Sequence, residues 1–504
     1  MIMVNLNVSI IKDKKNYLLV YFIFIAIFYA SFSNLENYMN FHFELAILLI
    51  LLISGILILL YSSNMELYKV SFIIILIFGL IMTLTTPVLI VCDESEHFAR
   101  SDLTAQGILN PEYVNGGYGV THLCDQLFSH SGETFFDNNL INEKIDSSIS
   151  FYDSCFAHNP FYAYLISAFG IFLAKLLDLN VIWAMWLGRF FNLLFYAVVC
   201  SYSIKKAPVY KIPLFIVSCI PLAIYQAASF SADCFIISVS IFSIAQFIYL
   251  YKSSKITVYD LSIFFASVLL ISLFKVPYVL FSFFILLIKR DRFDSKNIFL
   301  LSRIVPFILL GISLAYTSYA SALLLNSARR DYFIGNNVNS SLQLNNLLDY
   351  PFKTMLLVSS IFSFTIGMIT DLFRFSHAYW SYESPLLYGL FFIFFTFVCL
   401  TYKEKNFSFS KKNRLFFFII TFLIYSAIIL IQYLSWAPVG YGKLDMIIGV
   451  YSRYYIPLLV LFPLIFKSDR LSSVIDIKNY DLKVILCSLI FLSGSIILTI
   501  SKFY

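Results

Sequence analysis

Apolar runs that are long enough to cross a lipid bilayer recur along the chain, separated by short polar stretches. A membrane-spanning helix needs roughly 17–25 predominantly apolar residues. Thirteen segments meet or approach that length: 17–33, 43–62, 70–91, 182–204, 212–229, 234–251, 258–274, 276–289, 299–325, 385–402, 415–434, 454–467 and 484–500. Of these, 276–289 and 454–467 are short and depend on their neighbours. The pattern predicts an all-α, polytopic membrane protein of about thirteen transmembrane helices.

Two further apolar segments, 160–178 and 352–370, do not fit the alternation of sides. If either one alone were a full span, lysine-rich loops further along the chain would lie on the outer side of the membrane, against the rule that Lys and Arg collect on the cytoplasmic side. We therefore predict that both are interfacial or re-entrant helices packed against the outer surface. The alternative, that they cross the membrane, requires a compensating span elsewhere.

Composition supports a membrane location. Of 504 residues, 60% are hydrophobic and only 13% are charged, and the mean hydropathy is +0.83. A water-soluble fold cannot bury that much apolar surface, whereas a bilayer solvates it directly. The basic N-terminal stretch and the apolar run after it lack a convincing small-residue cleavage site, so we interpret 17–33 as a retained span and not as a signal peptide.

The distribution of charge predicts the orientation. If the N-terminus is cytoplasmic, 23 of the 35 lysines and arginines fall on the inner side, whereas 20 of the 29 acidic residues fall on the outer side. An excess of Lys and Arg in short loops marks the cytoplasmic side. The one long connection, 92–159, then lies outside, and long loops in compact proteins are usually functional.

The long outer loop opens with the charged stretch "VCDESEHFAR", residues 91–100. If 93–103 is helical, Asp93, His97 and Arg100 share one face, and Glu96 and Arg100 form an i, i+4 pair. A simple solvated loop is the alternative reading. Ionisable groups at the edge of the apolar region are costly and tend to be functional, which favours a site here.

Further charges lie at the outer ends of later spans. Asp233 ends one span, Lys275 sits at a Val-Pro break, and Arg453 opens a late span beside Tyr454. Each could snorkel to the interface. Together, carboxylates and separate cations at one depth suit a ligand with an anionic phosphate, leaving the carboxylates for acid–base chemistry.

Other chemistry has less support. The chain has no Walker loop, dinucleotide fingerprint, zinc-ligand spacing or nucleophile elbow, so no cofactor is identified and no nucleic-acid partner is expected. Asp93 and His97 could ligate a divalent cation, but two ligands make a weak site. In an oxidising outer compartment, Cys124 and Cys155 could form a disulfide; free thiols are the alternative.

The motifs resemble a large bacterial membrane family of unassigned function within the GT-C superfamily of polyprenyl-phosphate-sugar glycosyltransferases. "DESEHFAR" is similar to that family's P-D-E-x-x-H-F-x-R-A signature, with Cys92 in place of the proline and Ser101 in place of the alanine. "HNPFYAYL" with His158, the Gly-Arg span with Arg189, "QAASFSAD", "LFKVPYVLF" and "GVYSRYYIP" follow in the family's order, over about 70–470.

The resemblance implies a GT-C-like fold and a hexosyltransferase that uses a polyprenyl-phosphate-linked sugar, the carrier being undecaprenyl phosphate. The acceptor would be a surface glycan such as O-antigen lipopolysaccharide or wall polysaccharide. It places Asp93, with Glu94 as partner or substitute, as the catalytic carboxylate, acting as a base on the acceptor hydroxyl or in association with a metal ion. Residues that would hold the lipid phosphate, orient the acids or touch the acceptor are His97, Arg100, His158, Arg189, Asp233, Lys275, Arg453 and Tyr454.

The same comparison predicts the organisation and location of the chain. Residues 1–65 would be two added N-terminal helices, 66–470 the GT-C-like catalytic module with 92–159 as its first outer loop, and 471–504 a C-terminal helix. The protein would reside in the bacterial inner membrane, with the active site on the periplasmic or extracellular face. A transporter, flippase or polymerase of lipid-linked glycans is the alternative.

Overall fold

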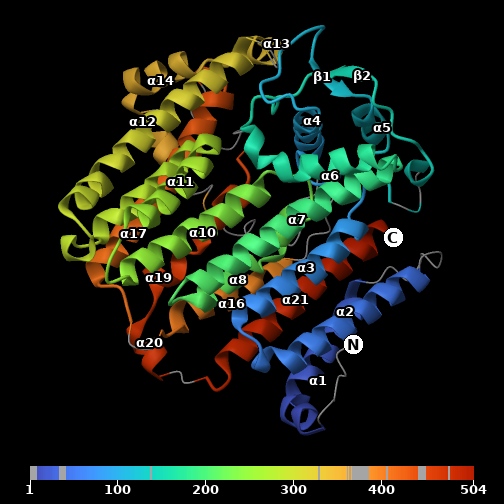
Figure 1. Ribbon diagram of the computed structural model, residues 1–504, viewed down its shortest axis with the longest axis vertical. Helices are drawn as coiled ribbons and strands as arrows, with labels where there is room; N and C mark the ends of the chain where they lie inside the picture. Colours follow the sequence, from blue (N-terminus) through green and yellow to red (C-terminus); the bar gives the residue numbers. More distant parts are fainter. Residues whose placement is uncertain are drawn as a thin grey trace.

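The computed structural model describes residues 8–32, 41–134, 136, 139–326, 330–352, 354–359, 361, 365, 385–404, 407–440, 450–474 and 477–504. Eight helices in these ranges are long and apolar enough to cross a membrane: α1 (Val8–Phe32), α2 (Phe41–Tyr61), α3 (Leu67–Thr85), α7 (Val181–Lys206), α10 (Asp233–Lys252), α12 (Lys296–Asn326), α17 (Lys411–Trp436) and α21 (Tyr480–Phe503). In Figure 1, α7, α3 and α21 run side by side through the middle of the molecule. The protein is therefore a polytopic membrane protein, as predicted.

All thirteen predicted segments are helical, but five of them are short or broken. Two form the 17-residue helices α11 (Val258–Phe274) and α16 (Pro385–Thr401). Two are interrupted: 212–229 divides into α8 (Lys211–Ser218) and α9 (Pro221–Ala227), and 454–467 comprises η7 (Ser452–Tyr455), α18 (Ile456–Leu459) and α19 (Phe462–Phe466). The last, 276–289, forms the 3₁₀ helix η5 (Val276–Leu287) in place of an α-helix.

Prolines explain these interruptions. A proline cannot donate a backbone hydrogen bond and is best tolerated in the first turn of a helix. Pro221, Pro277, Pro457 and Pro463 each occupy the first or second position of a new helical piece. Pro306, by contrast, lies inside α12, which continues past it.

The described residues of the predicted outer loop 92–159 form a layer at one end of the long helices (Figure 1). It contains α4 (Glu94–Ala105), β1 (Tyr118–Thr121), α5 (Leu123–Ser129), η3 (Asn139–Ile141) and β2 (Ile149–Tyr152). The two strands pair antiparallel, with Tyr118 opposite Tyr152 and Thr121 opposite Ile149. This small sheet is a departure from the all-α prediction. Buried side chains of the layer form their own apolar cluster against α6 and α7.

The segment 160–178 forms η4 (Phe161–Ala163) and the 12-residue helix α6 (Leu165–Leu176), which packs on α4 and α7. A helix of 12 residues is about 18 Å long, too short to cross the roughly 30 Å hydrocarbon core. The length agrees with the predicted interfacial helix. The segment 352–370 lies mostly outside the described residues.

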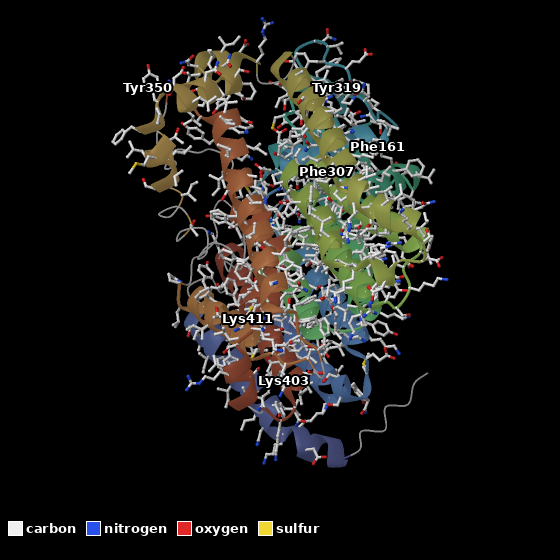
Figure 2. The ribbon with its side chains drawn as sticks, turned by 90° about the vertical axis from the view of Figure 1, so that its left-hand side faces the viewer. Phe161, Phe307, Tyr319, Tyr350, Lys403 and Lys411 are labelled. Carbon is white, nitrogen blue, oxygen red and sulfur yellow. The ribbon has the colours of Figure 1, made fainter. Side chains whose placement is uncertain are left out.

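Charged and aromatic side chains mark the two ends of the long helices. Figure 2 shows Lys403 and Lys411 at one end, and Tyr319 and Tyr350 at the other. Short elements complete the fold: η2 (Ser62–Asn64), η6 (Arg290–Arg292), α13 (Arg330–Gly335), α14 (Ser340–Asp349) and α20 (Asp469–Val474). The 92–159 layer lies at the end with Tyr319, away from the two lysines.

The N-terminal helices α1 and α2 pack on α21 near the other end of the chain. The hydroxyl of Tyr21 donates to the carbonyl of Leu51, 2.9 Å away, and lies 2.9 Å from the hydroxyl of Ser493. Gly55 makes room for the ring, because a Cβ there would lie 2.2 Å from it. The described residues of the predicted N-terminal addition 1–65 and of the predicted C-terminal helix segment 471–504 thus contact each other, while the three-part division of the chain stays a prediction.

Of the two alternatives for Cys124 and Cys155, the structure shows thiols and not a disulfide. None of the eight cysteines, all of which lie in the described ranges, is in a disulfide; Cys124 is buried in the apolar cluster of the 92–159 layer, whereas Cys155 is only partly buried. Cys155 instead uses its backbone N–H to donate to Glu96 at 3.0 Å.

Candidate active site

The connection from α3 to α4 has an uncommon backbone. Leu89 and Asp93 both have positive φ, 47° and 63°. Such left-handed conformations cost about 1–3 kcal/mol each and persist only where the surrounding structure imposes them. Here Val88 exchanges two backbone hydrogen bonds with the loop at Gly132 and Glu133, at 2.7 and 3.0 Å. The turn is therefore held in place, and Asp93 stands outside the helix that begins at Glu94.

Glu94 and Arg189 form the buried support of this turn. Nε and Nη2 of Arg189, from α7, donate to the two carboxylate oxygens of Glu94 at 2.8 and 2.7 Å, and both side chains have no exposed surface. Arg189 also donates to the carbonyls of Thr86 and Pro87 at 2.8 and 2.9 Å. The guanidinium thus ties the end of α3 to the start of α4.

Asp93 belongs to a different ion cluster. Arg453 donates from Nη2 to Asp93 at 2.5 Å and from Nε to Asp233 at 2.6 Å, and the ammonium of Lys275 lies 3.2 Å from Asp233. Asp93 is the most exposed of the four side chains, at 19%, whereas that of Arg453 is 1% exposed. Two carboxylates and two cations, which come from four separate elements, therefore compensate one another.

Tyrosine rings cover the cations. The ammonium of Lys275 lies 3.0 Å from the centroid of the Tyr454 ring, and the guanidinium carbon of Arg453 lies 4.3 Å from that of Tyr451. The hydroxyl of Tyr278 donates to the backbone carbonyl of Tyr454. Cation–π contacts of this kind strengthen when water is excluded. The rings thus help to hold the two cations in place.

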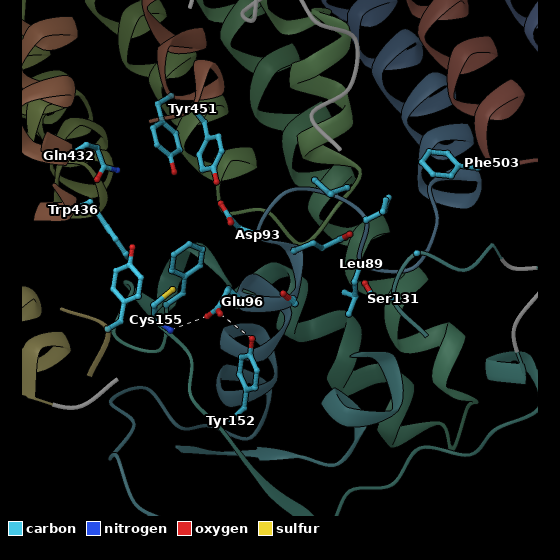
Figure 3. Close-up of a pocket in the computed structure, with 18 residues that line it drawn as sticks. Leu89, Asp93, Glu96, Ser131, Tyr152, Cys155, Gln432, Trp436, Tyr451 and Phe503 are labelled. Carbon is cyan, nitrogen blue, oxygen red and sulfur yellow. Dashed lines mark hydrogen bonds between the residues drawn. The ribbon is translucent and has the colours of Figure 1, made fainter. Parts of the chain in front are cut away.

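A cavity of about 920 Å³ opens beside Asp93. Figure 3 shows Asp93 close to Tyr451, with Gln432 and Trp436 from α17 on the facing side. Other lining residues include Glu94, Glu96, Tyr152, Cys155, Phe156, Tyr454 and Phe503. Within the described part of the chain, Arg453, Asp233 and Lys275 are not among the lining residues. The cations therefore lie behind Asp93 and Tyr454.

His97 is buried one turn along α4 from Asp93. Its Nδ1 lies 2.9 Å from the hydroxyl of Tyr164, to which the side-chain amide of Asn159 also donates at 3.0 Å. Burial lowers the pKa of His97 to about 4, and the negative charges of Asp233 and Asp93 only partly offset this effect. His97 is therefore neutral at physiological pH.

The predicted i, i+4 pair of Glu96 and Arg100 on α4 is wrong. Glu96 and Arg100 have separate partners: Glu96 accepts from Ser154 Oγ at 2.7 Å and from Tyr152 Oη at 3.0 Å (Figure 3). Arg100 donates to the carbonyls of Asn159 and Leu109, at 3.0 and 2.9 Å. Both side chains thus fasten the 92–159 layer. Arg100 is not among the described residues that line the Asp93 cavity, but its guanidinium carbon lies 5.9 Å from the ring centroid of Tyr164, the hydrogen-bond partner of His97.

His158 lies in a second, separate cavity of about 290 Å³, between the 92–159 layer and α12. Its Nε2 is 3.0 Å from the hydroxyl of Tyr118, while its buried Nδ1 has no partner among the described residues. Burial lowers the pKa of His158, and the nearby charge of Arg100 lowers it further. The walls supply tyrosine and asparagine side chains, which suits an uncharged polar ligand.

The arrangement does not fit a divalent cation. In the described ranges, no three His, Cys, Asp or Glu side chains gather as a metal site. The space between Asp93 and Asp233 is bridged by the guanidinium of Arg453, which pairs with both carboxylates. The positive charge between these two carboxylates is therefore supplied by Arg453.

Comparison with known proteins places the chain in one family. Residues 76–462 match the model of a family described as predicted membrane protein, DUF2142. The chain belongs to the DUF2142 family. No curated protein and no solved structure matches it.

The match covers every charged residue of the Asp93 cluster and the buried Glu94–Arg189 pair. The helices α1 and α2 lie outside it, as does α21, which nevertheless contributes Phe503 to the cavity of this DUF2142 protein. The sequence did not identify Tyr451, Gln432 and Trp436 as site residues. In a chain that is 19% aromatic, the tyrosine and tryptophan gave no distinct signal.

Proposed function

We propose that this DUF2142 protein is a GT-C-type glycosyltransferase. It transfers a sugar from undecaprenyl phosphate, or a similar polyprenyl phosphate, to a surface glycan such as O-antigen or wall polysaccharide. The protein lies in the bacterial inner membrane with its N-terminus in the cytoplasm, and the Asp93 cavity opens on the extracytoplasmic side, as the lysine and arginine distribution favours.

The main support for the proposal is that the carboxylate of Asp93 lies at a cavity and is paired with a buried arginine. That carboxylate lines a cavity of about 920 Å³ at the end of a membrane-length helix, and a buried arginine holds its charge. Pockets of about 300–1,000 Å³ suit ligands of drug size or one or two sugar rings. A donor whose lipid tail stays in the bilayer can present its sugar phosphate at this depth.

The residues suit an acid–base role in transfer. The acceptor hydroxyl oxygen attacks the anomeric carbon, and Asp93 takes the hydroxyl proton. The bond from that carbon to the phosphate oxygen breaks, and the phosphate leaves with the electron pair. The added negative charge on the departing phosphate is stabilised by Lys275 and Arg453, which lie just behind Tyr454 and Asp93.

The geometry favours Asp93 over Glu94 as the base. Glu94 gives both oxygens to Arg189 and also accepts from the backbone N–H of Phe230 at 3.2 Å. A base must lie within about 2.6–3.2 Å of the proton that it takes. Glu94 and Arg189 are therefore positioning residues, and the guanidinium of Arg189 is already bonded to Glu94 and to the carbonyls of Thr86 and Pro87.

The test is to incubate the purified protein with a polyprenyl-phosphate sugar and an acceptor glycan and to measure released polyprenyl phosphate. Loss of a general base lowers rates by about 10²–10⁴-fold, so Asp93→Asn should lose that much activity. Asp125→Asn is the matched control, because Asp125 lies in the same layer with its side chain 41% exposed and pairs with His122. Full activity of Asp93→Asn would overturn the assignment of the base.

A transporter, flippase or polymerase of lipid-linked glycans is the competing function. A transporter would place ionisable groups in broken helices at mid-membrane. In the described chain the charged cluster sits at helix ends: Asp233 begins α10 and Lys275 follows α11. Donor that stays intact in the assay, but moves across a vesicle membrane, would favour the transporter.

A further inference from the structure

A second feature lies at the other end of α3. An open groove of about 480 Å³ runs between the start of α3 and the end of α7, and it involves none of the residues around Asp93. Its walls are Phe72, Ile73 and Val198, with Tyr68 at the end of the apolar surface. Val198 is 51% exposed, so the groove opens outward from the bundle.

Two lysines stand at the polar end of this groove. The ammonium groups of Lys69 and Lys205 lie 5.8 and 5.3 Å from the centroid of the Tyr68 ring. Neither forms an ion pair with a carboxylate that the structure describes, and Glu66, three residues before Lys69, pairs with neither. Two uncompensated positive charges around one ring repel each other, and a phosphate placed between them would remove that repulsion.

A buried hydroxyl adds an independent observation. Ser201, which also lines the groove, is 5% exposed, and its hydroxyl has no hydrogen-bond partner in the described part of the chain. Leaving a buried polar group unpaired costs about 1–3 kcal/mol. A ligand with oxygen atoms near the lysines would satisfy it.

The position fits a lipid headgroup. The 19 residues of α3 rise by about 28 Å, close to the roughly 30 Å thickness of the hydrocarbon core. If the Asp93 end lies at one membrane surface, the groove lies at the other. Its apolar walls then extend from the headgroup level toward the membrane centre.

We propose that this groove binds one anionic phospholipid. The headgroup phosphate lies between Lys69 and Lys205, the glycerol oxygens reach Ser201, and an acyl chain follows Phe72, Ile73 and Val198. Basic pockets between transmembrane helices favour anionic lipids in this way. The site is independent of the transferase chemistry, so either proposal can fail without the other.

The test uses the full-length protein in detergent, with bound lipid counted by native mass spectrometry during titration with phosphatidylglycerol. Phosphatidylethanolamine, which has the same phosphate but no net charge, is the comparison lipid. Glycerol phosphate, which has no acyl chains, tests whether binding requires an acyl chain. We expect one phosphatidylglycerol to bind at least tenfold more tightly than either. Equal affinity for the two lipids would overturn the proposal.

Variants locate the binding. Lys69→Gln with Lys205→Gln should weaken phosphatidylglycerol binding at least tenfold, and Val198→Trp should weaken it by filling the groove while keeping both lysines. Lys252→Gln is the matched control, because Lys252 is exposed at the end of α10 and lies 4.5 Å from the Phe407 ring, outside the groove. Unchanged binding in the double variant, or a second protein copy in place of lipid, contradicts the proposal. Thermal unfolding checks that each variant folds.

Discussion

Asp93 and Glu94 are neighbours in the chain, and each pairs with a buried arginine, yet the two pairs differ in almost every other respect. The Glu94 pair is fully buried, with Arg189 also bound to backbone carbonyls. The Asp93 pair borders a cavity, and Arg453 is shared with a second carboxylate. One pair is used to build the turn, and the other is available for chemistry.

The backbone explains how adjacent residues reach such different surroundings. Asp93 has φ of 63° and precedes the helix, while Glu94 begins it. Both residues line the cavity, but the Glu94 carboxylate is bonded to Arg189 of α7, whereas that of Asp93 is 19% exposed and meets Arg453. The two carboxylates of this acidic pair therefore have different surroundings, and the proposed base is the one that Arg453 shares with Asp233.

The largest expected effect is on folding at Glu94. Glu94→Gln leaves the charge of Arg189 buried without a counter-ion, and removing one partner of a buried pair costs about 3–5 kcal/mol. Asp93→Asn should cost about 1 kcal/mol or less, because Asp93 is partly exposed and Arg453 keeps Asp233. Unfolding in detergent, followed by circular dichroism, measures both. Equal losses of stability would remove the distinction between the pairs.

His97 gives the next effect, through pH. Its pKa is about 4 in the folded protein and about 6.5 when unfolded, so below pH 6.5 the unfolded state binds the proton first. Stability should therefore fall as the pH decreases from 6.5 to 4, by about 3 kcal/mol, and be retained above 6.5. Asp93, Asp233, Arg453 and Lys275 act on the same histidine.

The measurement is the unfolding free energy at several pH values for the wild type and for His97→Gln. The variant, which has no imidazole, should lose about 3 kcal/mol less over that interval. His122→Gln is the matched control, because the imidazole of His122 is on the surface of the same layer, with its side chain 51% exposed. Parallel curves for wild type and His97→Gln would show that His97 is not the group responsible.

The sequence predicted the helix at 93–103 closely, since α4 covers Glu94–Ala105. It also grouped Asp93, Asp233, Lys275 and Arg453, because charged residues at the ends of spans on one side share a depth. It could not show which acid meets which arginine. That depends on a single positive φ at Asp93, for which a carboxylate side chain gives no clear signal.

Other features were readable only in part. The breaks in 212–229 and 454–467 could have been inferred from Pro221 and Pro457, but Pro306 lies within an unbroken helix, so proline alone does not decide the outcome. The antiparallel pairing of β1 with β2 was missed because it joins residues about 30 apart within a polar loop.

The smallest expected effect concerns how Asp93 is held. Arg453 uses two nitrogens to bridge Asp93 and Asp233, a geometry that a lysine ammonium cannot reproduce. In the released-polyprenyl-phosphate assay, Arg453→Lys should lower kcat about 10–100-fold, a loss of about 1.4–2.7 kcal/mol of transition-state stabilisation, with a smaller change in KM. Lys275→Gln, which removes the ion pair with Asp233 but none with Asp93, should lower kcat less. If Lys275→Gln costs more than Arg453→Lys, the phosphate contact and not the orientation of Asp93 dominates, and the shared arginine is not what distinguishes Asp93 from Glu94.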